Sequence, residues 1–66
     1  MAIDKKIIMG ITYKIYQEGE DTGRKVTVYY DKGNIEKRTQ VITDLKEDYP
    51  TEFGYALIKE SEKPAF

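Results

Sequence analysis

Residues 6–16 have the sequence KIIMGITYKIY, and their hydropathy alternates with a period of two. Its odd-numbered positions carry only aliphatic and aromatic side chains, namely Ile7, Met9, Ile11, Tyr13 and Ile15. Its even-numbered positions include lysine, glycine and threonine. Successive side chains of a β-strand point to opposite faces of the sheet, so the pattern predicts a strand with one buried face. An α-helix would distribute the same apolar side chains around its circumference.

A second strand is expected over residues 24–31. There Val26, Val28 and Tyr30 alternate with Lys25, Thr27 and Tyr29. Residues 17–23, between the two strands, contain two glycines and three acidic residues, which predicts a loop. We therefore expect an antiparallel hairpin whose two apolar sets share one face.

Two registers of this hairpin place both apolar sets on the same face of the sheet. One places Lys14 opposite Thr27. The other, two residues tighter, places Lys14 directly opposite Lys25, and like charges in that position are unfavourable. The tighter register would also place Tyr29 over Gly10, an arrangement that compensates for glycine in a strand. We favour the first register because it avoids the lysine pair.

Residues 35–43 are predicted to form a third strand after a turn at residues 31–34. Their polar composition suits an edge strand, where charged side chains discourage unwanted pairing. Residues 44–49 predict a short helical turn that ends near Pro50. The sequence thus indicates a mainly β fold with a small antiparallel sheet of three to four strands.

The last part of the chain fits two patterns. Spacing of two over residues 53–59 favours a fourth strand, whereas the spacing of four from Leu45 to Leu57 favours a helix. We predict the strand because Gly54 weakens a helix more than a strand edge. The alternative is an α+β fold with a C-terminal helix on the sheet. Residues 61–66 are expected to be loosely ordered.

The composition argues against catalysis. The chain has 66 residues, which leaves room for one small globular domain over residues 1–66 with a thin core. It contains neither cysteine nor histidine, and so lacks the commonest metal ligands and the commonest general base. It has no glycine-rich phosphate-binding motif, and its acidic clusters lie in polar loops. We expect a non-enzymatic protein without a cofactor or a bound metal.

Charge and hydropathy bear on the location of the protein. No apolar run approaches the roughly 20 residues that a membrane span needs. The start of the chain, MAIDKK, is charged, and the apolar stretch after it is too polar for a signal peptide. We therefore expect a cytoplasmic protein without a membrane partner. The formal net charge of −1 provides no overall attraction to nucleic acid.

Tyrosine is the informative residue type, with six copies in the chain. Tyr16 and Tyr29 fall on the face opposite the apolar set in either register. The other residues expected on that face are Lys14, Lys25, Thr12 and Thr27. Such a face suits a protein interface, in which tyrosine is enriched, or a surface that stacks bases and holds phosphates. It would also arise from an aromatic pair that the C-terminal segment covers.

Our preferred hypothesis is a small protein-interaction module, an accessory, adaptor or inhibitor of the kind frequent among phage and mobile-element proteins. It would bind a protein partner through the sheet face or through the edge strand at residues 35–43. The alternative is weak binding of single-stranded nucleic acid by Tyr16, Tyr29, Lys14, Lys25 and Arg38. Homo-oligomerisation is a further option, because small folds without disulfides or metals often associate.

Overall fold

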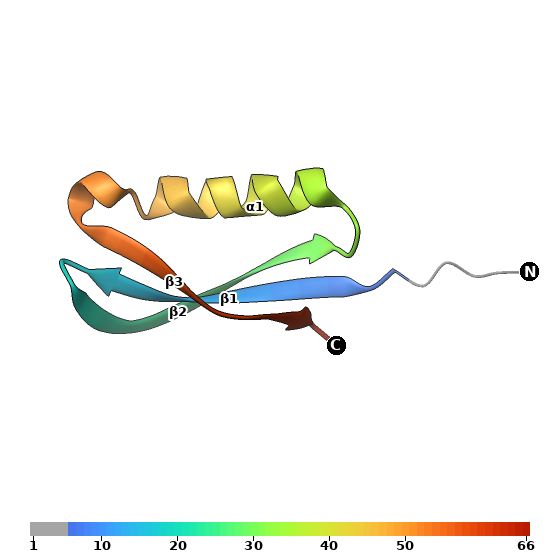
Figure 1. Cartoon of the computed structure of the whole chain (residues 1–66), viewed down its shortest axis with the longest axis horizontal. Helices are drawn as coiled ribbons and strands as arrows, with labels where there is room; N and C mark the ends of the chain where they lie inside the picture. The colour runs from blue at the N-terminus through green and yellow to red at the C-terminus, as the bar shows by residue number, and fades with distance from the viewer. Residues whose placement is uncertain (1–5) are drawn as a thin grey trace, which may run out of the picture.

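The computed structural model describes residues 6–66, so most of the charged start of the chain lies outside the described part. The prediction of a mainly β fold with a small antiparallel sheet is confirmed: three strands pair in the order β2-β1-β3 (Figure 1). The elements along the chain are β1 (Ile8–Gln17), β2 (Glu20–Asp31), α1 (Ile35–Asp48), the 3₁₀ turn η1 (Thr51–Phe53) and β3 (Tyr55–Pro64).

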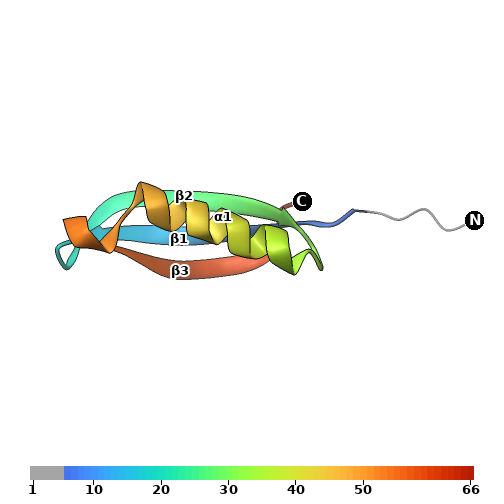
Figure 2. The same ribbon diagram turned by 90° about the horizontal axis from the view of Figure 1, so that it is seen from above.

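The molecule has two layers. Both outer strands run antiparallel to the central β1 and are therefore parallel to each other. The helix α1 connects β2 to β3 and crosses one face of the sheet, and the crossover is right-handed, as in nearly all such connections (Figure 2). No element within residues 6–66 covers the opposite face of the sheet (Figure 1). We call it the open face.

The hairpin between β1 and β2 is tighter than expected. The predicted loop over residues 17–23 contracts to Glu18 and Gly19, because β2 begins at Glu20. Both loop residues have positive φ, 52° and 82°, as a type I′ turn requires. Gln17, Glu20 and Asp21 of the predicted loop belong to the paired strands, and Thr22 and Gly23 form a bulge in β2 where the register shifts beside Ile15.

Glu18 is the only non-glycine residue with positive φ within residues 6–66. Asparagine tolerates this conformation better than glutamate, so Glu18→Asn should stabilise the protein by about 0.5–1 kcal/mol. Urea denaturation followed by circular dichroism measures the change. The control is Glu20→Asn, at the first position of β2, where the same substitution should give no gain. A loss of stability in Glu18→Asn would contradict the turn geometry.

The favoured hairpin register is wrong. The structure has the tighter one, with Lys14 directly opposite Lys25. Each lysine has an acidic partner that offsets the repulsion. Lys14 Nζ lies 3.4 Å from Asp21 Oδ2, and Lys25 Nζ lies 2.9 Å from Glu60 Oε1. The prediction considered only the repulsion between the two lysines and did not include these acidic partners.

The third predicted strand is also wrong, because residues 35–43 form the first part of α1. The predicted turn at residues 44–49 is the last part of the same helix. Asn34 caps the helix: its side chain accepts a hydrogen bond of 3.0 Å from the Lys37 N–H. The residues that α1 turns toward the sheet follow spacings of four, three and four, namely Arg38, Ile42, Leu45 and Tyr49.

The fourth predicted strand exists but is displaced toward the C-terminus, and the alternative of a C-terminal helix is wrong. Phe53 belongs to η1, which Gly54 ends with a φ of 84°. β3 then continues to Pro64, through residues expected to be loosely ordered. A bulge leaves Glu60 as an extra residue, since Lys59 pairs with Tyr13 and Ser61 with Thr12.

The core is thin and lies between β1 and α1. Four hydrophobic residues are buried within residues 6–66: Ile11, Tyr13, Ile15 and Leu45. Half-buried side chains surround this cluster, among them Val26 and Val28 of β2, Tyr49 at the end of α1 and Leu57 of β3. The odd-numbered face of β1 is therefore the buried one, as its alternation predicted.

Candidate functional site

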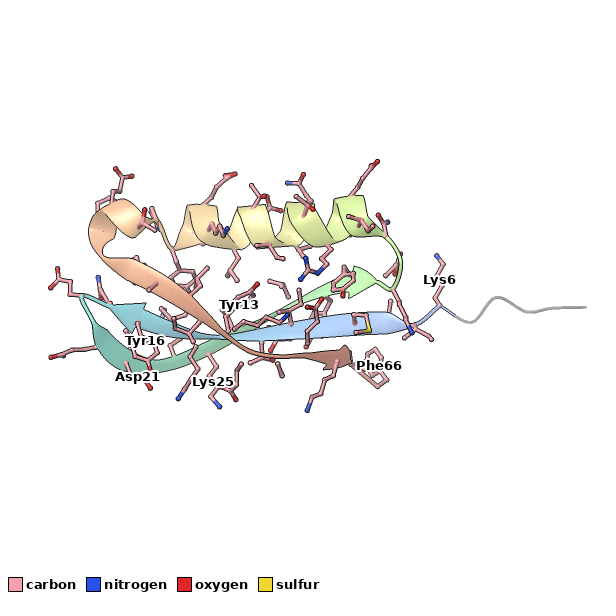
Figure 3. All side chains as sticks on the ribbon, viewed as in Figure 1. Lys6, Tyr13, Tyr16, Asp21, Lys25 and Phe66 are labelled. Atoms are coloured by element: carbon pink, nitrogen blue, oxygen red, sulfur yellow. The ribbon has the colours of Figure 1, made fainter. Side chains whose placement is uncertain are left out.

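The open face gathers six of the seven residues that sequence analysis selected as a candidate site. Figure 3 shows Tyr16 and Lys25 on the side of the sheet away from α1, whereas Tyr13 points toward the helix. The strand register places the other four beside them, because pairing partners share a face. These residues are Thr12, Lys14, Thr27 and Tyr29. The third strand adds Ala56, Ile58 and Lys63 to the same face.

Two apolar side chains on this face are strongly exposed. Tyr29 keeps 53% of its surface exposed, and Ile58 keeps 50%. The Tyr29 ring lies over Gly10, where an added Cβ would come within 3.3 Å of the ring. A depression of about 200 Å³ lies beside this ring, and its floor includes Gly10 and Thr12. A flat aromatic ring next to a hollow offers an anchoring point for another molecule.

The polar side chains at the centre of the open face have hydrogen-bond or ion-pair partners within the protein. Thr12 Oγ1 and Thr27 Oγ1 are 2.9 Å apart and share a hydrogen bond. Asp21 forms a hydrogen bond with Lys14 and raises the pKa of that ammonium group. The Gly23 N–H, followed by Lys14, lowers the pKa of Asp21. Both groups therefore stay charged near neutral pH, and the two lysines of the predicted site are each paired with an acid.

Arg38, the seventh predicted residue, does not belong to this face. It lies on α1, and its guanidinium forms two hydrogen bonds with Glu62 of β3, at 2.8 and 3.0 Å. Lys59 Nζ donates to the same carboxylate at 2.7 Å, and the Tyr30 hydroxyl also donates to it. We call these four residues the Glu62 network. It connects α1 to β3 and β2 on the covered side of the sheet.

The Glu62 network is electrostatically strong. The Glu62 side chain is only 16% exposed. Hydrogen bonds from Arg38, then from Lys59 and Tyr30, hold the pKa of its carboxyl well below the usual range. The same contacts raise the pKa of Arg38 and of the Tyr30 hydroxyl. The sequence analysis missed Glu62 because it placed this residue in a loosely ordered tail. The network therefore has a structural role, since it holds α1 against the sheet.

A second concave region lies between the end of α1 and the start of β3. It is a groove of about 770 Å³, open to solvent, and its walls include Tyr49, Pro50, Tyr55 and Leu57. The rings of Tyr49 and Tyr55 meet edge to face, with centroids 5.3 Å apart. The groove exists because α1 crosses the sheet diagonally and leaves the first half of β3 uncovered (Figure 2).

No other arrangement in residues 6–66 suggests a ligand. In this part of the chain, no three acidic residues gather as metal ligands. The same residues include no helix with the length and apolarity of a membrane span. Comparison of the chain with protein-family models, curated proteins and solved structures finds no match.

Proposed function

We propose that the chain is a non-enzymatic interaction module that binds a protein partner through the open face. One observation carries the proposal: the uncovered face of the sheet presents Tyr29 and Ile58 at about half exposure. Antiparallel sheets commonly leave one face in water, but that face is usually polar. Exposed tyrosine and aliphatic side chains within a polar surround are typical of the anchors of protein interfaces. As such a module, the protein would serve as an accessory, adaptor or inhibitor of its partner.

The charges favour a protein partner over nucleic acid. Binding to phosphates relies on lysines and arginines that are free to replace counterions. Lys14 and Lys25 are already paired with Asp21 and Glu60, and Arg38 lies on the other side of the sheet. The formal net charge is −1. An arrangement of matched ion pairs around apolar anchors fits the polar rim of a protein interface.

The Tyr29 ring is expected to be the main anchor. Because truncating a central interface tyrosine often costs about 2 kcal/mol, Tyr29→Ala should weaken binding at least about tenfold. The measurement is quantitative capture from a host lysate on immobilised chain, with and without nuclease. The control is Phe53→Ala, which removes an aromatic ring of similar exposure, 63%, outside the open face.

Three results are informative. A stoichiometric protein that is retained by Phe53→Ala, lost with Tyr29→Ala and unaffected by nuclease supports the proposal. Equal retention by both variants would place the binding surface elsewhere. Loss after nuclease treatment, with an affinity that falls steeply as salt is added, would favour the nucleic-acid alternative. Thermal unfolding of each variant shows whether the fold survives.

A further inference from the structure

The two edges of the sheet differ in how they resist pairing with another strand. The edge formed by β3 carries the features that natural proteins use against such pairing. It contains a bulge at Glu60, ends in Pro64 and has charged side chains at Lys59, Glu62 and Lys63. A strand that approached this edge would meet an irregular backbone and a proline without an N–H donor.

The edge formed by β2 contains no proline, and its bulge is confined to the end beside the hairpin turn, although Arg24, Lys25 and Asp31 are charged. From Arg24 to Asp31 its pairing with β1 is regular, without a bulge. This stretch contains no proline or glycine and has the β-branched run Val26-Thr27-Val28 at its centre. A neighbour lies on one side only, because β2 is the outermost strand of the sheet. A regular, β-branched edge of this length, without a proline or a bulge, is a template for another strand.

We propose that a second copy of the chain pairs with this edge, β2 against β2 and antiparallel, with a two-fold axis at Val28. The axis must pass through a residue, because a one-residue slip would join the covered face of one copy to the open face of the other. With the axis at Val28, Val26 lies opposite Tyr30 of the second copy. Lys25, whose Nζ also contacts Glu60 of its own chain, then lies opposite Asp31 of the second copy.

The neighbouring registers do not place Lys25 opposite an acidic residue. An axis at Thr27 would place Lys25 opposite Tyr29, and an axis at Tyr29 would place it opposite Gly33 in the turn. The Val28 register pairs opposite charges at both ends of residues 25–31 and joins apolar side chains on the covered face. Cross-strand pairs of both kinds stabilise antiparallel sheets. Within residues 25–31 the charge pairing therefore favours the Val28 register over its neighbours, while the same register places Arg24 opposite Lys32 just outside this stretch.

The fold also gains from such a partner and limits the assembly to two copies. With four buried hydrophobic residues in the described part, a single copy has little interior to stabilise it. Pairing through β2 joins the two sheets into one, in the order β3-β1-β2-β2-β1-β3. Its outer edges are then both β3, which are protected, so further strands do not add.

The first test is the mass of the purified chain alone by sedimentation equilibrium. We expect a concentration-dependent rise from 7.7 kDa toward twice that mass. Lys25→Glu and Asp31→Lys each place like charges at both ends of the interface, and each should weaken the dimer at least about tenfold. The double variant exchanges the charges and should restore the dimer. Lys46→Glu, on the exposed side of α1, is the matched control and should have no effect.

The second test uses the absence of cysteine from the chain. Two copies of residue 28 would face each other at the axis, with Cα atoms about 4.5–5.5 Å apart, within reach of a disulfide. Two copies of residue 26 would be offset by four residues, about 13 Å, and out of reach. Val28→Cys should therefore form covalent dimers under mild oxidation, and Val26→Cys, at a similarly half-buried site, should not.

The proposal is overturned if the folded chain remains a monomer at about 1 mM. It is equally overturned if the charge reversals leave the affinity of the dimer unchanged, or if Val26→Cys cross-links as readily as Val28→Cys. Should either cysteine variant fail to fold, the charge reversals and their double variant decide. None of these measurements involves the protein partner proposed above, so the two proposals fail separately.

Discussion

Ile11→Ala is expected to leave most of the protein unfolded at 25 °C. Ile11 lies at the middle of the central strand, its exposed fraction is 0%, and it packs in the cluster that joins the sheet to α1. Truncation of such a side chain costs about 2–5 kcal/mol. A domain of this size holds about 3–5 kcal/mol in total, so the loss is comparable with the whole free energy of unfolding. Far-UV circular dichroism in a urea titration measures the effect.

The adjacent residue provides the control for this prediction. Thr12 lies on the open face, and its contribution is a hydroxyl–hydroxyl contact with Thr27 at 2.9 Å. Thr12→Ala should cost about 1 kcal/mol or less, since a typical hydrogen bond contributes that much. If Ile11→Ala instead melted within a few degrees of the parent protein, the assignment of the buried face would be wrong.

Glu62→Gln is expected to have the second largest effect, a loss of about 1–2 kcal/mol. The substitution keeps the size of the side chain but removes the charge that Arg38 and Lys59 share. Two cations would then lie side by side without a counter-charge. The control is Glu60→Gln, two residues away, where the carboxylate has a single, more exposed partner in Lys25. That variant should lose clearly less stability.

Acid should abolish the difference in the free energy of unfolding between the parent protein and Glu62→Gln. Because the pKa of Glu62 is lower in the folded state than its usual value of 4.5, its contribution is fully present above about pH 5. The contribution of Glu62 to stability declines as the pH falls below that value, since the unfolded chain then takes up a proton that the folded chain does not bind. Urea titrations between pH 7 and pH 3 should show the two curves converging. Parallel curves would mean that the pKa of Glu62 is the same in the folded and unfolded states.

The part of the fold that sequence analysis predicted rests on period-two alternation. This signal is strong in β1, where every second residue from Met9 to Ile15 is apolar, and it was enough to identify the buried face. The open face follows from the same parity, which is why six of its residues could be named before the register was known. The register itself depends on Glu60, a residue that lies two strands away from Lys25.

The helix was missed because its sheet-facing side contains a charged residue. Arg38 occupies a position where an apolar side chain would have revealed the helical period, and its partner Glu62 is 24 residues away. The β-branched residues Thr39, Val41, Ile42 and Thr43 added a local preference for a strand. Tertiary contacts and the Asn34 cap outweigh that preference. Arg38, which was named as a candidate binding residue, lies on this helix and not on the open face.

The position of β1 at the centre of the sheet has a consequence for biosynthesis. β1 leaves the ribosome well before one of its two neighbours, β3, because β2 and α1 lie between them along the chain, and the pairing of β1 with β3 joins Met9 to Pro64. Until β3 emerges, β1 lacks its second neighbour, and α1 has no Glu62 to hold it. Pairing between segments so distant along the chain is slow, because a long loop must close before any contact forms. The nascent chain is therefore expected to expose one unpaired edge of the apolar strand β1 until β3 has been synthesised.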